Sequence, residues 1–190
     1  MRRFYILRHG EVDENHLGLL VGGGTDSPLN IEGIEAAEKT KAALDRAKIT
    51  FDKVYASPLR RTARTAEIMA PNRPLVFLNS LKEIDFGEME LSYAPNLVGV
   101  EFGKNGVESL EHLQSRVMDA WNYILEDSKN QTSTVLVATH ATIIRALLAG
   151  LKGSDVMREV GNSNCCATII DVASDGKVTI VGENICFYDE

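Results

Sequence analysis

Short apolar runs alternate with longer amphipathic segments along the chain. The apolar runs are rich in β-branched and aromatic residues, as is typical of strands buried on both faces of a sheet. The last two runs flank Asp175-Gly176, a dipeptide that indicates a β-hairpin. The strands that this pattern predicts are residues 4–7, 54–56, 75–78, 134–138, 165–172 and 177–182.

The segments between these runs carry apolar residues at helical spacing. Asn30 can cap a helix that runs from residue 31 to about residue 48, and Ser109 can cap a long helix with Trp121 on its buried stripe. Ser57 can cap a further helix, with Pro58 in its first turn. A last helix follows residue 140 and stops near residue 150. Helices that alternate with strands predict an α/β fold.

No internal repeat, linker or low-complexity tract divides the 190 residues, so we expect one domain over residues 1–190. Two long segments lack a clear period, residues 11–30 and 89–106, and we expect loops there. Loops of this length are often functional. We expect His16 in the first loop to be exposed to solvent. The role of both loops in specificity stays open.

Charge and cysteine content narrow the class of protein. The net charge is −7, which argues against a nucleic-acid partner, because such proteins usually present a basic face. No stretch reaches the roughly 20 apolar residues of a membrane span, and the short apolar run before Arg8 leads us to expect no signal peptide. The three cysteines form no CxxC pair, so we expect reduced thiols and a cytoplasmic location.

Two predicted strands end in the same way. The first is followed by Arg8, His9 and Gly10, and the strand 134–138 is followed by Thr139 and His140. A histidine at a strand end is often only structural. In open α/β sheets, however, ligands bind beyond the carboxyl ends of strands, so both imidazoles can meet at one edge.

Arg60 and Arg61 lie where the helix after Ser57 begins. A cation is disfavoured at the positive end of a helix by about 0.3–1 kcal/mol, unless an anion binds there. The pair therefore suggests a phosphate or carboxylate site. The alternative is that both side chains reach solvent, which suits Arg60 better than Arg61.

Residues 81–88 contain three carboxylates, Glu83, Asp85 and Glu88. Such a segment is usually a solvated acidic loop, but a partly buried carboxyl with a raised pKa can act as a general acid. Together with the basic groups above, Glu83 permits phosphoryl transfer through a phosphohistidine. No metal-ligand spacing is present, and the arginines can neutralise the phosphoryl charge, so we expect no metal and no cofactor.

The ordered set of motifs resembles the histidine phosphatase superfamily, the phosphoglycerate-mutase-like group, over nearly the whole chain. The motifs are Arg8-His9-Gly10-Glu11, Asp26-Ser27-Pro28-Leu29 with Gly33, Ser57-Pro58-Leu59-Arg60-Arg61-Thr62 with Thr65-Ala66, Leu81-x-Glu83-x-x-Phe86-Gly87, Thr139-His140, Asn164-Cys165-Cys166 and Asn184. The resemblance implies a three-layer α/β/α fold with a mostly parallel central sheet.

The resemblance also implies residue roles. His9 would be the phosphorylated nucleophile and Glu83 the proton donor. The groups expected to hold the phosphoryl group are Arg8, Asn15, Arg61, His140 and the backbone N–H of Ala141. The chain departs from the family pattern at Gly22, at Ala141 and at Leu91, where the family often has glutamine, glycine and glycine. These departures concern substrate contacts, because none removes a charged catalytic group.

The sequence favours a phosphatase over a mutase. Ile84 and Phe86 stand where the mutases of this group have arginine and tyrosine, and residues 89–106 hold one basic residue, Lys104. We therefore expect a metal-independent phosphomonoesterase acting on a small phosphorylated metabolite, such as a sugar phosphate or ribazole phosphate. The alternatives are mutase-type phosphoryl transfer and a catalytically silent binding module. A small-molecule phosphomonoester is the expected partner, and a homodimer is left open.

Overall fold

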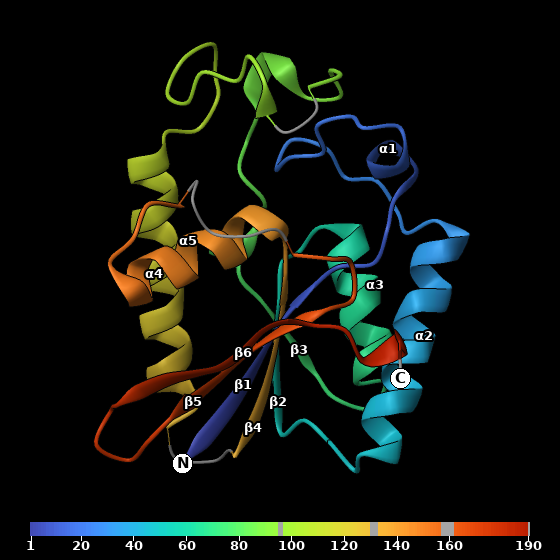
Figure 1. The fold of residues 1–190 in the computed structure, drawn as a ribbon, viewed down its shortest axis with the longest axis vertical. Helices are drawn as coiled ribbons and strands as arrows, with labels where there is room; N and C mark the ends of the chain where they lie inside the picture. The colour runs from blue at the N-terminus through green and yellow to red at the C-terminus, as the bar shows by residue number, and fades with distance from the viewer. Residues whose placement is uncertain (95–96, 130–132, 157–161, 190) are drawn as a thin grey trace.

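One six-stranded sheet forms the centre of the molecule, in the order β3-β2-β4-β1-β5-β6 (Figure 1). The computed structural model describes residues 1–94, 97–129, 133–156 and 162–189. β1 to β4 are parallel, whereas β5 and β6 form an antiparallel hairpin beside β1. The strands are β1 (Arg2–Arg8), β2 (Lys53–Ala56), β3 (Leu75–Phe77), β4 (Thr134–Thr139), β5 (Ala167–Val172) and β6 (Val178–Ile185).

Helices pack on both faces of this sheet, which confirms the predicted α/β/α layers (Figure 1). They are α1 (Asp13–His16), α2 (Ile31–Arg46), α3 (Arg60–Met69), α4 (Leu110–Asp127) and α5 (Ala141–Lys152), with short 3₁₀ helices at Asn79–Leu81, Gly87–Met89 and Phe187–Asp189. α2 and α3 cover one face, and α4 and α5 cover the other. In the described part of the chain, none of the helices has the length and apolar character needed to cross a membrane.

Alternate residues of β1 supply the two cores. Phe4 and Ile6 join the core under α4 and α5, whereas Tyr5 and Leu7 join the core under α2 and α3. Trp121 of α4 is buried against Phe4, with ring centroids 4.9 Å apart in an edge-to-face arrangement. The two-residue period of a strand thus gives both layers an apolar surface to cover.

Two predicted helix caps are confirmed and one is wrong. Asn30 accepts a hydrogen bond from the backbone N–H of Gly33, and Ser109 accepts one from that of His112. Ser57, however, does not cap α3, which begins at Arg60 with Pro58 outside it. The side chain of Asp26 accepts a hydrogen bond from the backbone N–H of Arg60 at 2.6 Å instead. The anionic group at this helix start therefore comes from a loop far away in sequence.

Element boundaries shift by a few residues from the expectation. The predicted loop 11–30 contains the short helix α1, and its Leu19 forms an isolated bridge with Tyr93 of the second loop. α2 stops two residues early, whereas α5 continues past residue 150 and ends before Gly153, which adopts a left-handed conformation with φ 68°. Residues 95 and 96 of the predicted loop 89–106 lie outside the described residues.

The cysteines differ from the expectation of reduced thiols. Cys166 and Cys186 form a disulfide, with their Cα atoms 4.3 Å apart, while Cys165 is free and buried. The reason is the register of the β5–β6 hairpin, in which Ala167 pairs with Ile185. The residues one step beyond that pair are the two cysteines, so the hairpin brings their side chains together.

Candidate active site

The ends of β1 and β4 meet at one edge of the sheet. The two strands are parallel neighbours, and Arg8 lies in register with Thr139. The backbone N–H of His9 donates to the carbonyl oxygen of Thr139 at 3.0 Å. The register therefore places His9 and His140 side by side, with ring centroids 5.0 Å apart.

His9 is held in one orientation by its own neighbour. Its Nδ1 lies 2.6 Å from the carbonyl oxygen of Gly10, which can only accept a hydrogen bond, so Nδ1 carries the proton. Nε2 of the neutral ring is then unprotonated. Burial, followed by the positive charges of Arg8 and Arg61, holds the pKa of His9 well below its usual value of 6.5. A buried, neutral imidazole with a fixed tautomer has the properties of a nucleophile.

The turn at Gly10 leaves no room for a side chain. A Cβ atom there would lie 2.5 Å from the carbonyl oxygen of Gly33 in α2, and one at Gly33 would lie 2.3 Å from the carbonyl oxygen of Glu11. The backbone N–H of Gly10 donates to Oγ1 of Thr65 at 3.0 Å. Close backbone contact, together with this hydroxyl, fixes the turn that follows His9.

His140 is fully buried and has one ring nitrogen in use. Its Nε2 lies 2.9 Å from Oγ of Ser57 and 3.1 Å from Oγ1 of Thr62, while Nδ1 has no hydrogen-bond partner within the described residues. Burial, followed by His9 and by the arginines, holds the pKa of His140 well below 6.5. Nδ1 is thus a polar atom in the interior that is available to a ligand.

Two arginines place positive charge near the imidazoles, Arg61 fully buried and Arg8 partly exposed, and each keeps one side-chain nitrogen without a partner among the described residues. Arg8 donates from Nη1 to the carbonyl oxygen of Asn162 at 2.5 Å. Arg61 has no exposed surface and donates to the carbonyl oxygens of Thr25 and Gly22. In both side chains Nε lacks a partner within the described residues. Burial lowers the pKa of both guanidiniums, and the nearby Glu83 opposes that effect.

Burial decides between the two explanations offered for the arginine pair. Arg61 points inward, as an anion-binding arginine must, whereas Arg60 is exposed. The loop that holds Arg61 is itself held by Glu90, which accepts hydrogen bonds from the backbone N–H groups of Gly22 and Gly24. Gly22, a departure from the family pattern, has no room for a longer side chain, because a Cβ would lie 2.5 Å from the carbonyl oxygen of Ile84.

Of the three carboxylates in the acidic segment, only Glu83 is buried. Its two oxygens accept hydrogen bonds from the backbone N–H groups of Ile84 at 2.9 Å and of Thr142 at 3.3 Å. Burial raises the pKa of Glu83 above 4.5, although those hydrogen bonds and the charges of Arg61 and Arg8 act in the opposite direction. The carboxyl is thus suited to hold a proton in the interior.

Two predicted site residues remain, Asn15 and Ala141. Asn15 is in α1, and its side-chain oxygen is buried without a hydrogen-bond partner in the part of the chain that the structure describes. Ala141 is the first residue of α5, directly after His140. Its carbonyl oxygen accepts a hydrogen bond from Asn162 at 3.3 Å. His16, as predicted, is exposed.

Sequence reasoning did not place the hydroxyl groups of Ser57, Thr62 and Thr65 in the site. All three belong to quoted motifs, but nothing in the sequence shows that two of them contact His140 and that the third contacts Gly10. Ser57 was instead expected to be a helix cap. A serine before a helix suits both roles, and only the position of His140, 83 residues later, distinguishes them.

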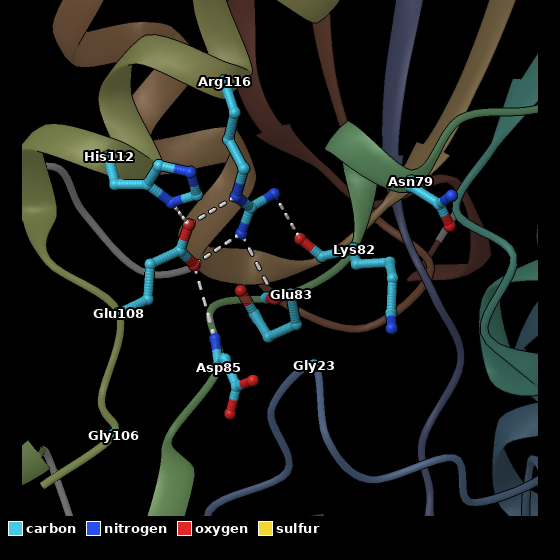
Figure 2. A pocket seen from close by; sticks show the side chains of 9 residues that line it. All are labelled: Gly23, Asn79, Lys82, Glu83, Asp85, Gly106, Glu108, His112 and Arg116. Carbon is cyan, nitrogen blue, oxygen red and sulfur yellow. Dashed lines mark hydrogen bonds and ion pairs between the residues drawn. The ribbon is translucent and has the colours of Figure 1, made fainter.

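A pocket of about 370 Å³ opens beside Glu83 (Figure 2). It is lined by Gly23, Asn79, Lys82, Glu83, Asp85, Gly106, Glu108, His112 and Arg116. Among the described residues, no group of three or more histidine, cysteine or carboxylate side chains has a metal-binding arrangement. Glu83 is the residue shared by this pocket and the cluster of His9, His140, Arg8 and Arg61.

Comparisons with known proteins point to one family. The model of the histidine phosphatase superfamily (branch 1) matches residues 4–184. PhoE of Bacillus subtilis (strain 168), described as an uncharacterized phosphatase, is 30% identical over 181 residues, which cover 90% of this chain and 88% of PhoE. The α-ribazole phosphatase of Shigella flexneri is 25% identical with a TM-score of 0.81, covering 96% of each chain.

A phosphoglycerate mutase from Bacillus anthracis str. Sterne has the same fold, with a TM-score of 0.85 at 23% identity, covering 98% of this chain and 94% of that one. Fold and sequence together define a phosphatase with a phosphoglycerate-mutase-like α/β architecture. The chain belongs to the histidine phosphatase superfamily, branch 1.

Proposed function

We propose that the protein is a metal-independent phosphomonoesterase that acts through a phosphohistidine on a small phosphorylated metabolite. One observation carries the proposal. Nδ1 of His9 is hydrogen-bonded to the carbonyl oxygen of Gly10, which leaves Nε2 as a neutral nucleophile within the electrostatic reach of the guanidiniums of Arg8 and Arg61. A purely structural histidine would have no need of such a charged neighbourhood, which is costly to bury.

In the first half-reaction, Nε2 of His9 attacks phosphorus and the bond from phosphorus to the leaving oxygen breaks. Arg8, Arg61 and the free Nδ1 of His140 stabilise the charge on the phosphoryl oxygens, which is the main source of catalysis in such transfers. The carboxyl of Glu83 gives its proton to the leaving oxygen, so the alcohol departs neutral. Asn15 and the backbone N–H of Ala141 complete the expected phosphoryl contacts.

In the second half-reaction, water replaces the alcohol. The carboxylate of Glu83 takes a proton from water as its oxygen attacks phosphorus, and the bond between phosphorus and Nε2 breaks. Inorganic phosphate leaves, and His9 and Glu83 return to their starting protonation states. The same carboxyl thus serves as acid and then as base.

The surroundings of Glu83 favour hydrolysis over mutase-type transfer. Ile84 and Phe86 are both buried in the apolar core, so they present no cation to a substrate carboxylate. The similarity to an α-ribazole phosphatase supports a metabolite monoester as the substrate class, within which a sugar phosphate or ribazole phosphate is the expected compound. We expect the enzyme to release the dephosphorylated alcohol and inorganic phosphate. We expect no isomerisation of 3-phosphoglycerate.

A catalytically silent binding module is the alternative from another class. It would bind phosphate with the same arginines but would have no use for a buried proton on Glu83. Hydrolysis of p-nitrophenyl phosphate in the presence of a chelator distinguishes the two. The wild-type protein and His16→Ala should hydrolyse the ester, and His9→Ala should not. Equal rates in wild type and His9→Ala would rule out the phosphohistidine mechanism.

A further inference from the structure

A single arginine of α4 contacts the backbone before the proposed acid and at the acid itself. Nη1 of Arg116 donates to the carbonyl oxygen of Ser80 at 2.8 Å. It also donates to that of Lys82 at 2.8 Å, and Nη2 donates to that of Glu83 at 3.3 Å (Figure 2). One rigid guanidinium therefore fixes three carbonyl groups within a four-residue segment. The segment connects the 3₁₀ helix at residues 79–81 to the carboxyl of Glu83.

Glu108 fixes the arginine in turn. Its carboxylate forms a paired contact with Arg116, from Oε1 to Nε at 2.6 Å and from Oε2 to Nη2 at 2.8 Å. The same residue also holds the segment after the acid, because its backbone N–H donates to the carbonyl oxygen of Asp85 at 2.8 Å. Both side chains are largely buried, with 8% and 16% of their surface exposed. A planar, paired contact of this kind defines orientation as well as charge.

The carboxyl of Glu83 is held from the opposite side by the backbone N–H groups of Ile84 and Thr142. Those two contacts orient the carboxyl relative to its own backbone and to α5. They leave open where the backbone itself lies relative to α4. Arg116 supplies that missing constraint, since it contacts the carbonyl groups before the acid and that of the acid itself.

We propose that Arg116, oriented by Glu108, is a positioning residue for proton transfer by Glu83. The inference rests on the proposed function, because it assumes that Glu83 protonates the leaving group. Arg116 itself does not need to touch the substrate. A shift of about 1 Å in a group that transfers a proton can cost roughly 100-fold in rate. We call the hydrogen bonds from Arg116 to the carbonyl oxygens of Ser80, Lys82 and Glu83 the clamp on Glu83. Loss of this clamp should imitate loss of the acid.

The leaving group provides the test. Phenyl phosphate releases a more basic alcohol than p-nitrophenyl phosphate and depends more on a proton donor. Arg116→Gln and Glu108→Gln should each lower kcat/KM for phenyl phosphate by about 10- to 100-fold, while p-nitrophenyl phosphate should change by less than about threefold. Glu83→Gln should show the same selectivity. Arg116→Lys, which can face Glu108 but not all three carbonyl groups, should recover only part of the activity.

The matched control is a paired contact in the sheet, away from the acid segment. Arg3 donates to both carboxylate oxygens of Asp171 at 2.8 Å, at the end of β1 opposite His9. Asp171→Asn therefore removes the same kind of interaction without touching the acid segment. It should leave the ratio of the two rates unchanged. Thermal unfolding of each variant shows which are folded, and Glu108→Gln carries the test if Arg116→Gln is not.

The possible results test the positioning role of Arg116 separately from the proposed function. Equal loss of both esters in Arg116→Gln and Glu108→Gln, with selective loss in Glu83→Gln, overturns the positioning role alone. Equal loss in Glu83→Gln overturns the acid assignment and the inference with it. An active His9→Ala protein overturns the proposed function instead. Selective loss in all three variants, with an unchanged ratio in Asp171→Asn, supports both.

Discussion

The imidazole rings of His9 and His140 lie 5.0 Å apart, with an angle of 61° between their planes. Each ring has one nitrogen in use, Nδ1 in His9 and Nε2 in His140. The other ring nitrogen is Nε2 in His9 but Nδ1 in His140. The pair is therefore not symmetric, which agrees with one nucleophile and one group that stabilises charge.

The hydroxyl groups of Ser57 and Thr62, which contact Nε2 of His140, set the tautomer of this ring. If Ser57 and Thr62 donate to Nε2, the proton of the ring is on Nδ1, where it can face a phosphoryl oxygen. The double variant Ser57→Ala/Thr62→Val should lower kcat for p-nitrophenyl phosphate by about 10-fold or more, as loss of an oriented donor does. Thr168→Val removes a buried hydroxyl that has no partner in the described residues and should leave kcat unchanged.

The pH dependence of kcat/KM follows from two opposite shifts. The pKa of His9 is lowered from 6.5, so the neutral nucleophile persists as the pH falls below that value. The pKa of Glu83 is raised from 4.5, so its proton is retained above that value. Activity should therefore reach a plateau that extends to acidic pH and fall on the alkaline side as Glu83 loses its proton.

The fall in kcat/KM at alkaline pH, the alkaline limb of the profile, should result from loss of the proton on Glu83. In Glu83→Gln the fall should disappear for an ester with a poor leaving group, since no proton is left to lose. The second ionisation of the substrate also changes kcat/KM with pH, so phenyl phosphate and p-nitrophenyl phosphate are compared at each pH. An alkaline limb that is unchanged in Glu83→Gln would assign it to another group.

Arg61 should contribute mainly to phosphoryl binding. Its buried guanidinium keeps Nε free, whereas Arg64, one turn later in α3, is exposed and pairs with Glu67. Arg61→Lys loses the planar fork and should raise the inhibition constant for inorganic phosphate or vanadate by about 10-fold or more. Arg64→Lys should leave it unchanged. Equal inhibition of the Arg61→Lys protein would remove this residue from the phosphoryl site.

Strands and helix caps depend on residues that are close together in the sequence, so they could be predicted. The same holds for the histidines that follow the strands. The apolar runs that became β1 and β4 each end before a histidine, and parallel pairing brings those ends together. The caps at Asn30 and Ser109 act on residues three positions later, so the local sequence was enough to identify them. The inward direction of Arg61 followed from its poor placement for a plain helix start.

Contacts between distant segments could not be predicted in this way. The cap of α3 comes from Asp26, 34 residues before Arg60, and Ser57 turns to His140 instead. The clamp on Glu83 depends on the packing of α4, which sequence periodicity places on a face of the sheet but not opposite a given carbonyl. Such contacts depend on tertiary packing, and a single sequence contains no direct signal for them.

The disulfide is another such contact, and it can be tested directly. Cys166–Cys186 closes a loop of 20 residues, for which removal costs about 3 kcal/mol in the chain-entropy description. Cys186→Ser should lower the thermal unfolding temperature and abolish its dependence on reductant, whereas substitution of the free Cys165 by alanine should keep that dependence. Peptide mapping without reduction should find the linked pair. A free thiol on Cys186 in oxidised protein would contradict this pairing.

The most direct test of the account is to trap the phosphoryl group on His9. Rapid quenching of wild type with substrate, followed by peptide mass mapping under basic conditions, should find a phosphoryl adduct on His9 that is stable to base and lost in acid. The adduct should accumulate in Glu83→Gln with p-nitrophenyl phosphate, because the second half-reaction then lacks its base. An active enzyme with no adduct, or with the adduct on another residue, would contradict the central claim.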